Sequence, residues 1–425
     1  MKLAAPQPLH LTYCSNVHPG ETWAEVFENL QQYVLPLKAQ IAPTASFGIG
    51  LRLSHQAAEQ LLQDNHLAAF HSWLQQHQLY VFTLNGFPYG GFHQQVVKDR
   101  VYAPDWTERS RLDYTLNLAN ILASILPDDI DGGISTVPLS YKPWYPTVMG
   151  RETALKQCCI QLAIAVEHLM QIQAITGKII HLDLEPEPDG LIENTAEVID
   201  FFENWLLPIA GGYLAERLNI PPAAAEIELL THICLCYDVC HFAVAYESPG
   251  FVFRQLQAAG IQIGKIQISA ALKVQVPHRA DSWDAFQRQL SPFAESTYLH
   301  QVVERCPGNQ FHHYRDLSDA LAQQSPLPGC EWRIHFHVPI FESEYGGSGD
   351  RPFQSTQSDI LETFQALSYY AHCNHLEIET YTWEVLPTAL KTDLLTSLQR
   401  EYEWAIAHLL KTQPPKIQPS KIQFR

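Results

Sequence analysis

Residues 179–188 read Ile179-Ile-His-Leu-Asp-Leu-Glu185-Pro-Glu187-Pro188, an apolar run that ends in acids. Side chains alternate between the two faces of a strand, so His181, Asp183 and Glu185 share one face. An unpaired buried carboxylate is costly, and an acid at the end of a buried strand therefore needs a partner. The stretch predicts a strand whose polar end belongs to a site, with a cation as the natural partner.

The same pattern recurs along the chain. Amphipathic stretches separate the apolar runs, and two of them, 155–170 and 360–370, have the spacing of a helix with one apolar face. Regular alternation of strand and helix favours a parallel sheet covered by helices, and eight such units fit a (β/α)₈ TIM barrel. The other predicted strands are Leu11–Asn16, Phe47–Leu53, Tyr80–Leu84, Gly133–Val137, His232–Asp238, Gly264–Ser269 and His375–Tyr381.

A doubly wound open sheet is the alternative architecture. It should carry a Gly-rich phosphate-binding turn after the first strand. The first strand instead runs into Cys14-Ser-Asn-Val-His-Pro-Gly20. The barrel is therefore the better prediction.

Two segments break the repeat and predict insertions. After the third strand comes a loop rich in Gly and aromatic residues, 85–106, which could cover a site. Between the seventh and eighth strands we predict a helix over Ser282–Arg305 and an extra strand over Trp332–Phe341. We expect a single barrel domain over residues 1–410, with an insertion at about 275–350, and a disordered tail over 411–425.

Composition excludes some functions. The 425 residues are 46% hydrophobic and carry a formal charge of −18, which disfavours binding to nucleic acid or anionic lipid. No signal-peptide core opens the sequence and no run approaches the ~20 apolar residues of a membrane span, so we expect a cytoplasmic protein without stable membrane insertion. Nine cysteines, an odd number, favour buried reduced thiols over disulfides. Cys234, Cys236 and Cys240 could suggest a metal cluster, but buried cysteines on an apolar strand are commoner, so we interpret them as buried thiols and not as a zinc site.

Acids also end two other strands. The sixth ends at Asp238, with His241 three residues later, and the eighth contains Glu379 at the corresponding height. Barrel enzymes place their sites at the carboxyl ends of the strands, so these side chains should meet. Oxygen ligands suit Mg²⁺ or Mn²⁺, and an added imidazole shifts the preference toward Mn²⁺, Co²⁺ or Zn²⁺. The alternative is that each acid forms a structural salt bridge with Arg or Lys.

The motifs LEPEP, DVCH and IETYTW together resemble those of the xylose-isomerase-like sugar isomerases and epimerases. The resemblance implies that Glu185, Asp238 and Glu379 bind a divalent metal with a residue of the seventh strand, here Gln267. It also implies that Glu185 and Glu379 act in catalysis while His241 faces the substrate. Gln267 stands where a His is usual, and an amide oxygen coordinates more weakly than an imidazole. Glu187 stands where the xylose isomerases proper have a Lys, which disfavours a simple aldose isomerase.

Within that superfamily the chain is most similar to the EboE metabolite-traffic proteins. The likeness runs through NGFPYGGFH, VYAPDW, HLDLEPEPDG, CYDVCHFAVAYE, KIQISAAL and HFHVPIF. It implies that the chain handles a small-molecule metabolite in an export pathway. Two kinds of protein partner are possible: other proteins of that pathway, and a second copy of the chain in a homodimer.

Further residues have both a functional and a structural interpretation. His335 and His337 form a His-x-His pair that faces substrate or a second metal, or else belongs to a polar strand. Glu187, His93, Lys142 and Trp144 are candidate substrate contacts or ordinary loop residues. Three functions follow: a metal-dependent isomerase or epimerase, a non-catalytic metabolite-binding carrier, and an amidohydrolase-type metal hydrolase.

Overall fold

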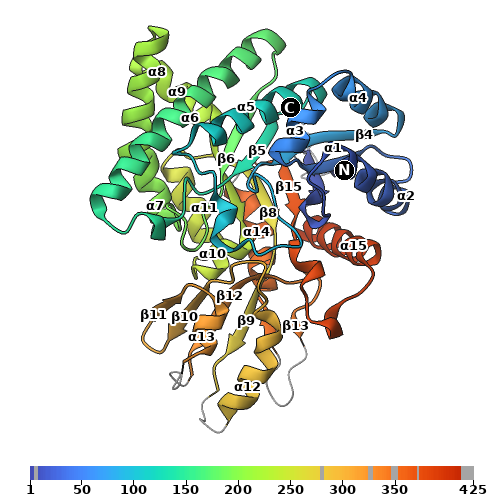
Figure 1. Ribbon diagram of the computed structural model, residues 1–425, viewed down its shortest axis with the longest axis vertical. Helices are drawn as coiled ribbons and strands as arrows, with labels where there is room; N and C mark the ends of the chain where they lie inside the picture. Colours follow the sequence, from blue (N-terminus) through green and yellow to red (C-terminus); the bar gives the residue numbers. More distant parts are fainter. Residues whose placement is uncertain (4–7, 278–281, 324–328, 346–352, 371–372, 413–425) are drawn as a thin grey trace, which may run out of the picture.

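The computed structural model describes residues 1–3, 8–277, 282–323, 329–345, 353–370 and 373–412. Its centre is a barrel of eight parallel strands, seen near the middle of Figure 1. The strand order is β2-β15-β8-β7-β6-β5-β4-β3, and a parallel bridge between Cys14 and Gly50 joins the two ends. The barrel prediction is therefore confirmed. The strands are β2 (Leu9–Tyr13), β3 (Phe47–Arg52), β4 (Leu79–Asn85), β5 (Gly132–Thr136), β6 (Ile180–Leu184), β7 (Ile233–Asp238), β8 (Ile263–Ile268) and β15 (His375–Ile378), with β1 (Lys2–Leu3) antiparallel to β2.

Helices cover the outside of the barrel, as parallel strands require. Their ends follow local sequence signals: Thr22 and Glu25 form a capping box before α1, and Asp238 caps α10. The helices are α1 (Trp23–Asn29), α2 (Leu35–Ile41), α3 (His55–Leu61), α4 (His66–Gln76), α5 (Arg109–Ile125), α6 (Val148–Thr176), α7 (Thr195–Asp200), α8 (Gly211–Leu218), α9 (Pro222–His232), α10 (Val239–Val244), α11 (Pro249–Ala258), α14 (Gln357–Tyr370) and α15 (Leu394–Thr412).

Helix α6 is apolar enough, with a mean hydropathy of 1.4 over 18 residues, to pass a test for membrane spans based on length and composition. The expectation that no run approaches that length was therefore too strict. In the structure α6 packs against α5, α8 and α9, and its apolar face, including Cys158, Leu162 and Val166, is buried. It is a covering helix of the barrel.

A second sheet lies between β8 and α14 and projects from the barrel in the lower part of Figure 1. Its order is β11-β10-β12-β9-β14-β13, and its pairs are antiparallel. We call it the insertion sheet. Its strands are β9 (Ala271–Gln275), β10 (Val302–Cys306), β11 (Gln310–Tyr314), β12 (Glu331–His337), β13 (Glu344–Tyr345) and β14 (Phe353–Ser355), with α12 (Trp283–Leu290) and α13 (Leu317–Leu321) beside them.

The helix predicted over Ser282–Arg305 is only partly present. Helix α12 ends at Leu290, where Pro292 lacks the amide hydrogen that would continue it. The β-branched Val302 and Val303 then enter β10, which pairs with β11 and β12. The strand predicted over Trp332–Phe341 is β12, which ends before Pro339.

Two other expectations need correction. Cys306 and Cys330 form a disulfide, because the pairing of β10 with β12 brings their Cα atoms to 4.2 Å; the other seven cysteines are free and buried. Helix α15 extends to Thr412, so the first two residues of the predicted tail are helical. The rest of that tail, 413–425, lies outside the described residues.

The barrel interior contains a buried ion pair. Lys265 Nζ lies 2.5 Å from Glu377 Oε2, and both side chains are fully buried. Gly50 faces this pair, and a Cβ there would lie 1.8 Å from Glu377 Oε1. The pair therefore requires glycine at this position.

Candidate metal and proton-transfer site

Polar residues from five strands meet at the carboxyl end of the barrel. Glu185 follows β6, Asp238 ends β7, Glu379 follows β15 and Asn85 ends β4, while Asn16 lies in the 3-10 turn Ser15–Val17 just after β2. All are at least 96% buried. Asn16, Asn85, Glu185 and Glu379 line a cavity of about 60 Å³. In the described part of the chain, no Lys or Arg side chain forms an ion pair with any of the three acids.

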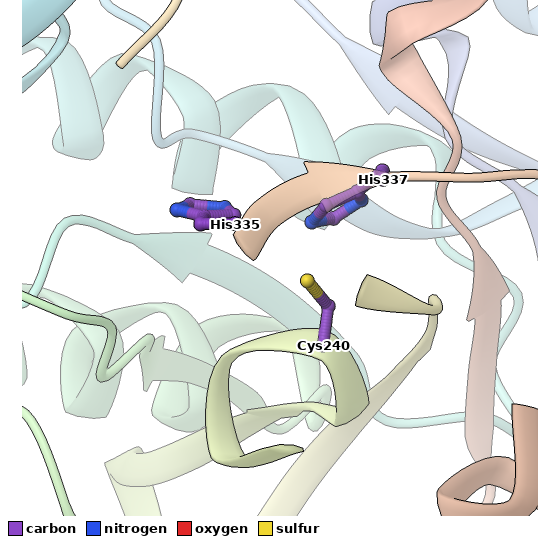
Figure 2. Close-up of side chains that lie close together, drawn as sticks. All are labelled: Cys240, His335 and His337. Carbon is purple, nitrogen blue, oxygen red and sulfur yellow. The ribbon is translucent and has the colours of Figure 1, made fainter. Parts of the chain in front are cut away.

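The insertion sheet adds two imidazoles to this end of the barrel. His335 and His337 lie at the end of β12, and Figure 2 shows both rings near the thiol of Cys240, which comes from α10. Ligand atoms of Cys240, His335 and His337 lie within 4.8 Å of one another, and so do those of Asp238, His241 and His337. Histidine and cysteine side chains at this spacing can ligate one metal ion.

The hydrogen bonds of Asp238 leave one of its oxygens free. Oδ1 accepts from Ser269 Oγ at 2.7 Å and from the backbone N–H of His241 at 3.1 Å, while Oδ2 has no hydrogen-bond partner. Oδ2 lies 3.9 Å from Nε2 of both His241 and His337. Although burial alone raises it, the pKa of Asp238 is lowered on balance by these two imidazoles and the bonds from Ser269 and His241. Asp238 is therefore an anion with one oxygen available to a cation.

The tautomers of the histidines follow from their partners. Carbonyl oxygens only accept, so Nδ1 of His241 donates to Pro186 O at 3.0 Å and Nδ1 of His337 donates to Glu379 O at 2.8 Å. The amide nitrogen of Gln301 donates to Pro188 O, which turns its oxygen toward His335 Nδ1 at 2.8 Å. All three rings therefore present a bare Nε2.

Two of these bare nitrogens face each other. Nε2 of His241 lies 3.1 Å from Nε2 of His335. Burial lowers the pKa of His241 to about 4 and that of His335 well below its usual value, so neither ring carries a second proton at neutral pH. Facing lone pairs repel, and a cation between them removes the repulsion. The donor set therefore fits a divalent metal.

The two glutamates of the cavity hold their protons more tightly than usual. Burial, and then the negative charges of Glu379 and Asp238, raise the pKa of Glu185 well above its ordinary value. Burial, Asp238 and Glu377 do the same for Glu379. The amides of Asn16 and Asn85 both donate to Oε1 of Glu379, at 2.7 and 3.1 Å, and fix the orientation of that carboxyl group.

Gln267, the seventh-strand residue expected as a ligand, has its amide oxygen 3.1 Å from the thiol of Cys236, which donates to it. Glu187 lines the cavity, with Oε2 3.6 Å from His335 Nδ1. The other candidate contacts lie elsewhere. His93 Nε2 donates to Asn16 O at 2.6 Å and ties the loop after β4 to the barrel. Lys142 Nζ pairs with Glu193 and Glu197, and Trp144 bonds to Asp99.

Sequence reasoning did not select several residues of the site. Asn16 and Asn85 end strands, which is the signal that identified the acids. Ser269, at the end of the predicted seventh strand, carries the same signal. Gln301 and Cys240 carry none, because their roles depend on how the insertion sheet and α10 pack on the barrel.

No family model matches the chain, and no curated protein matches it. Among solved structures it is similar to the IolI protein with a bound zinc atom, at 11% identity and a TM-score of 0.47, covering 95% of this chain and 99% of that one. It is also similar to a D-tagatose 3-epimerase-like protein, at 10% identity and a TM-score of 0.47, covering 95% of this chain and 98% of that one. A xylose isomerase domain protein from Alicyclobacillus acidocaldarius is similar at 11% identity and a TM-score of 0.44, covering 94% of this chain and 99% of that one. The fold itself is established by the strand order of the barrel.

Proposed function

We propose that the chain is a metal-dependent isomerase or epimerase of a small hydroxy-carbonyl metabolite. One observation carries the proposal. Bare Nε2 atoms of His241, His335 and His337 and the free oxygen of Asp238 converge beside a cavity that two proton-retaining glutamates also line.

The metal would be held first by Asp238, His241 and His337. His335 and Cys240 lie close enough to complete the coordination. Imidazole and thiolate donors favour Zn²⁺ or Co²⁺, with Mn²⁺ next, over Mg²⁺. A bound divalent ion supplies a Lewis acid that polarises a substrate carbonyl and acidifies the neighbouring C–H.

The two glutamates are suited to move the proton of that C–H. A carboxyl group whose pKa is raised above its ordinary value is a stronger base than an exposed carboxylate. For this the two groups must start in different protonation states: Glu379, held by Asn16 and Asn85, would accept the proton as a carboxylate, and Glu185 would return one as a carboxylic acid. Transfer between the two carbons of a hydroxy-carbonyl gives isomerisation, and return to the opposite face of one carbon gives epimerisation.

The substrate is small and polar. A volume of about 60 Å³ holds only a few water molecules. Phe92 and Val97 of the loop after β4 pack on Tyr298 and Tyr381 above the cavity. A sugar-sized ligand therefore requires these aromatic residues to move, and their closure over it would exclude water from the reacting carbons.

The resemblance to EboE proteins supports a role for this chemistry in the traffic of an exported metabolite, with proteins of that pathway as partners. The carrier alternative is favoured by Gln267, which lacks the imidazole usual at its position. An amidohydrolase reaction would use two metals bridged by a modified lysine or a carboxylate. Lys265, the lysine of β8, is bound to Glu377 and Ser135.

The test is proton exchange. The Zn²⁺- or Mn²⁺-loaded protein is incubated in D₂O with a panel of ketoses, aldoses and inosose-type polyol ketones, and deuterium next to the carbonyl is measured by NMR. We expect incorporation by the wild type and loss of at least about 100-fold in rate for Glu379→Gln. The matched control, Glu342→Gln at the surface, should behave as the wild type. If a ligand co-purifies and no compound shows deuterium exchange, the protein is a carrier and this proposal is wrong. If two ions bind at this end of the barrel and a substrate is hydrolysed, the protein is an amidohydrolase.

A further inference from the structure

A second cluster of metal-ligating side chains lies at the opposite end of the barrel. His181 is the second residue of β6, His375 is the first of β15, and Asp131 precedes β5, so all three belong to the amino ends of the strands. Their ligand atoms lie within 4.8 Å of one another. None of them takes part in the site at the carboxyl end.

The two imidazoles converge on one carboxylate. Nε2 of His375 lies 3.3 Å from Asp131 Oδ1, and Nε2 of His181 lies 3.7 Å from Asp131 Oδ2. Two atoms bound to one Zn²⁺ at about 2.0–2.1 Å in a tetrahedron lie roughly 3.3 Å apart. The His375 distance equals this spacing, and the His181 distance, to the other carboxylate oxygen, is a few tenths of an ångström longer.

A buried acid fixes the orientation of one of these imidazoles. Nδ1 of His181 lies 2.6 Å from Oδ1 of Asp183, whose side chain is fully buried. This bond leaves Nε2 of His181 directed at Asp131. A carboxylate behind a histidine is the usual outer partner of a metal ligand. Asp183 fits at this position because residue 264 is a glycine: a Cβ on Gly264 would lie 2.0 Å from Oδ1 of Asp183.

His375 is fully buried, and among the described residues its Nδ1 has no polar partner while its Nε2 has only the Asp131 carboxylate, 3.3 Å away. Burying ring nitrogens with so few partners is costly. A metal bound between Nε2 and Asp131 would give Nε2 a ligand bond.

The cluster opens into a cavity of about 510 Å³. Asp131 and His181 line this cavity together with Cys234, Asn374 and apolar residues of α11, and the side chain of Asp131 is 40% exposed. The cavity gives an ion an entry path and leaves room for a further ligand at its open coordination position.

We infer that Asp131, His181 and His375 bind a divalent transition metal, Zn²⁺ by preference, with one coordination position facing the cavity at the amino end of the barrel. Two histidines and one carboxylate with an open position form a site that can hold water or an oxygen of a small ligand. The inference does not depend on the function proposed for the opposite end.

The test counts metal ions. Wild type, Asp131→Asn, His375→Gln and His337→Gln are each saturated with Zn²⁺, freed of excess ion by gel filtration and measured by elemental mass spectrometry. Binding constants come from competition with a chromogenic chelator. We expect two ions in the wild type and one in each variant. Asp131→Asn should weaken its site by more than the roughly 10- to 100-fold that loss of an outer-shell partner costs.

Controls separate the two sites from misfolding. Asn is isosteric with Asp, and the circular dichroism of Asp131→Asn should match that of the wild type without metal. His168→Gln removes a histidine of α6 that bonds to Asn120 and belongs to neither site, so it should retain two ions. If Asp131→Asn binds as many ions as the wild type with equal affinity, the inference fails. The inference also fails if the wild type binds one ion that His337→Gln loses and Asp131→Asn keeps. That result would leave the proposed function intact.

Discussion

Nε2 of His337 lies 3.9 Å from Oδ2 of Asp238, and neither atom has a hydrogen-bond partner among the described residues. His337 comes from the insertion sheet and Asp238 from the barrel. The two sheets therefore meet at a pair of atoms suited to hold one ion.

His337→Gln should weaken metal binding at the carboxyl end of the barrel. The substitution removes a bare imidazole nitrogen and replaces it with an amide, a poorer ligand. We expect the dissociation constant for Zn²⁺ at that site to rise at least about 100-fold, measured by competition with a chelator. His312→Gln, on the exposed β11 of the same sheet, is the control. Equal affinity in both variants would remove His337 from the site.

Breaking the buried pair of Lys265 and Glu377 should destabilise the protein strongly. Either Lys265→Met or Glu377→Leu alone leaves one group buried without its partner, at a cost of about 3–5 kcal/mol. The double variant Lys265→Met with Glu377→Leu should recover much of the loss, because it leaves no buried charge in the pair. Urea unfolding of the four proteins gives the coupling free energy, and additive losses would contradict the prediction.

Gly50→Ala should be destabilising by about 1–3 kcal/mol or more, because the new methyl group would overlap the carboxylate of Glu377. Gly212→Ala is the matched control. Gly212 lies in α8 with no atom within 4 Å of an added Cβ, so alanine there should be neutral or stabilising. The comparison is made by thermal unfolding, and a Gly50→Ala protein as stable as the control would show that the barrel interior can adjust.

Glu401 should make stability depend on pH. Burial raises the pKa of Glu401 to about 7, and this effect outweighs the hydrogen bonds from Thr380 and the backbone N–H of Ile340. The folded state then binds more protons than the unfolded state between pH 4.5 and 7, so the contribution of Glu401 to the free energy of unfolding falls as pH rises through this window.

The decrease should be on the order of 3 kcal/mol and should level off above pH 7. Glu401→Gln keeps an oxygen for Thr380 and cannot ionise. The difference in free energy of unfolding between variant and wild type should therefore grow from pH 5 to pH 8, and a constant difference would contradict the assignment.

The barrel could be predicted because each strand carries its own signal. An apolar run with a polar end, as in Ile180–Leu184 followed by Glu185, is visible within about ten residues, and all eight predicted strands coincide with observed strands to within a few residues. The acids that end these strands were identified for the same reason.

The insertion sheet depends on contacts between distant residues. The strand character of β10 comes from pairing with β12, some thirty residues later, and the local pattern of Ser282–Arg305 indicated a helix instead. The same pairing joins Cys306 to Cys330, which a count of cysteines could not predict. His335 and His337 were recognised as a metal-like pair, but their position beside Asp238 follows from how the sheet packs on the barrel.

The insertion sheet connects to the barrel through short segments, with two residues between β8 and β9 and one between β14 and α14. His335 and His337 stand at the end of β12 nearest the barrel, so a small tilt of the whole sheet changes the separation of the imidazoles from Asp238. The position of these two imidazoles relative to Asp238 is therefore fixed by the orientation of the whole insertion sheet.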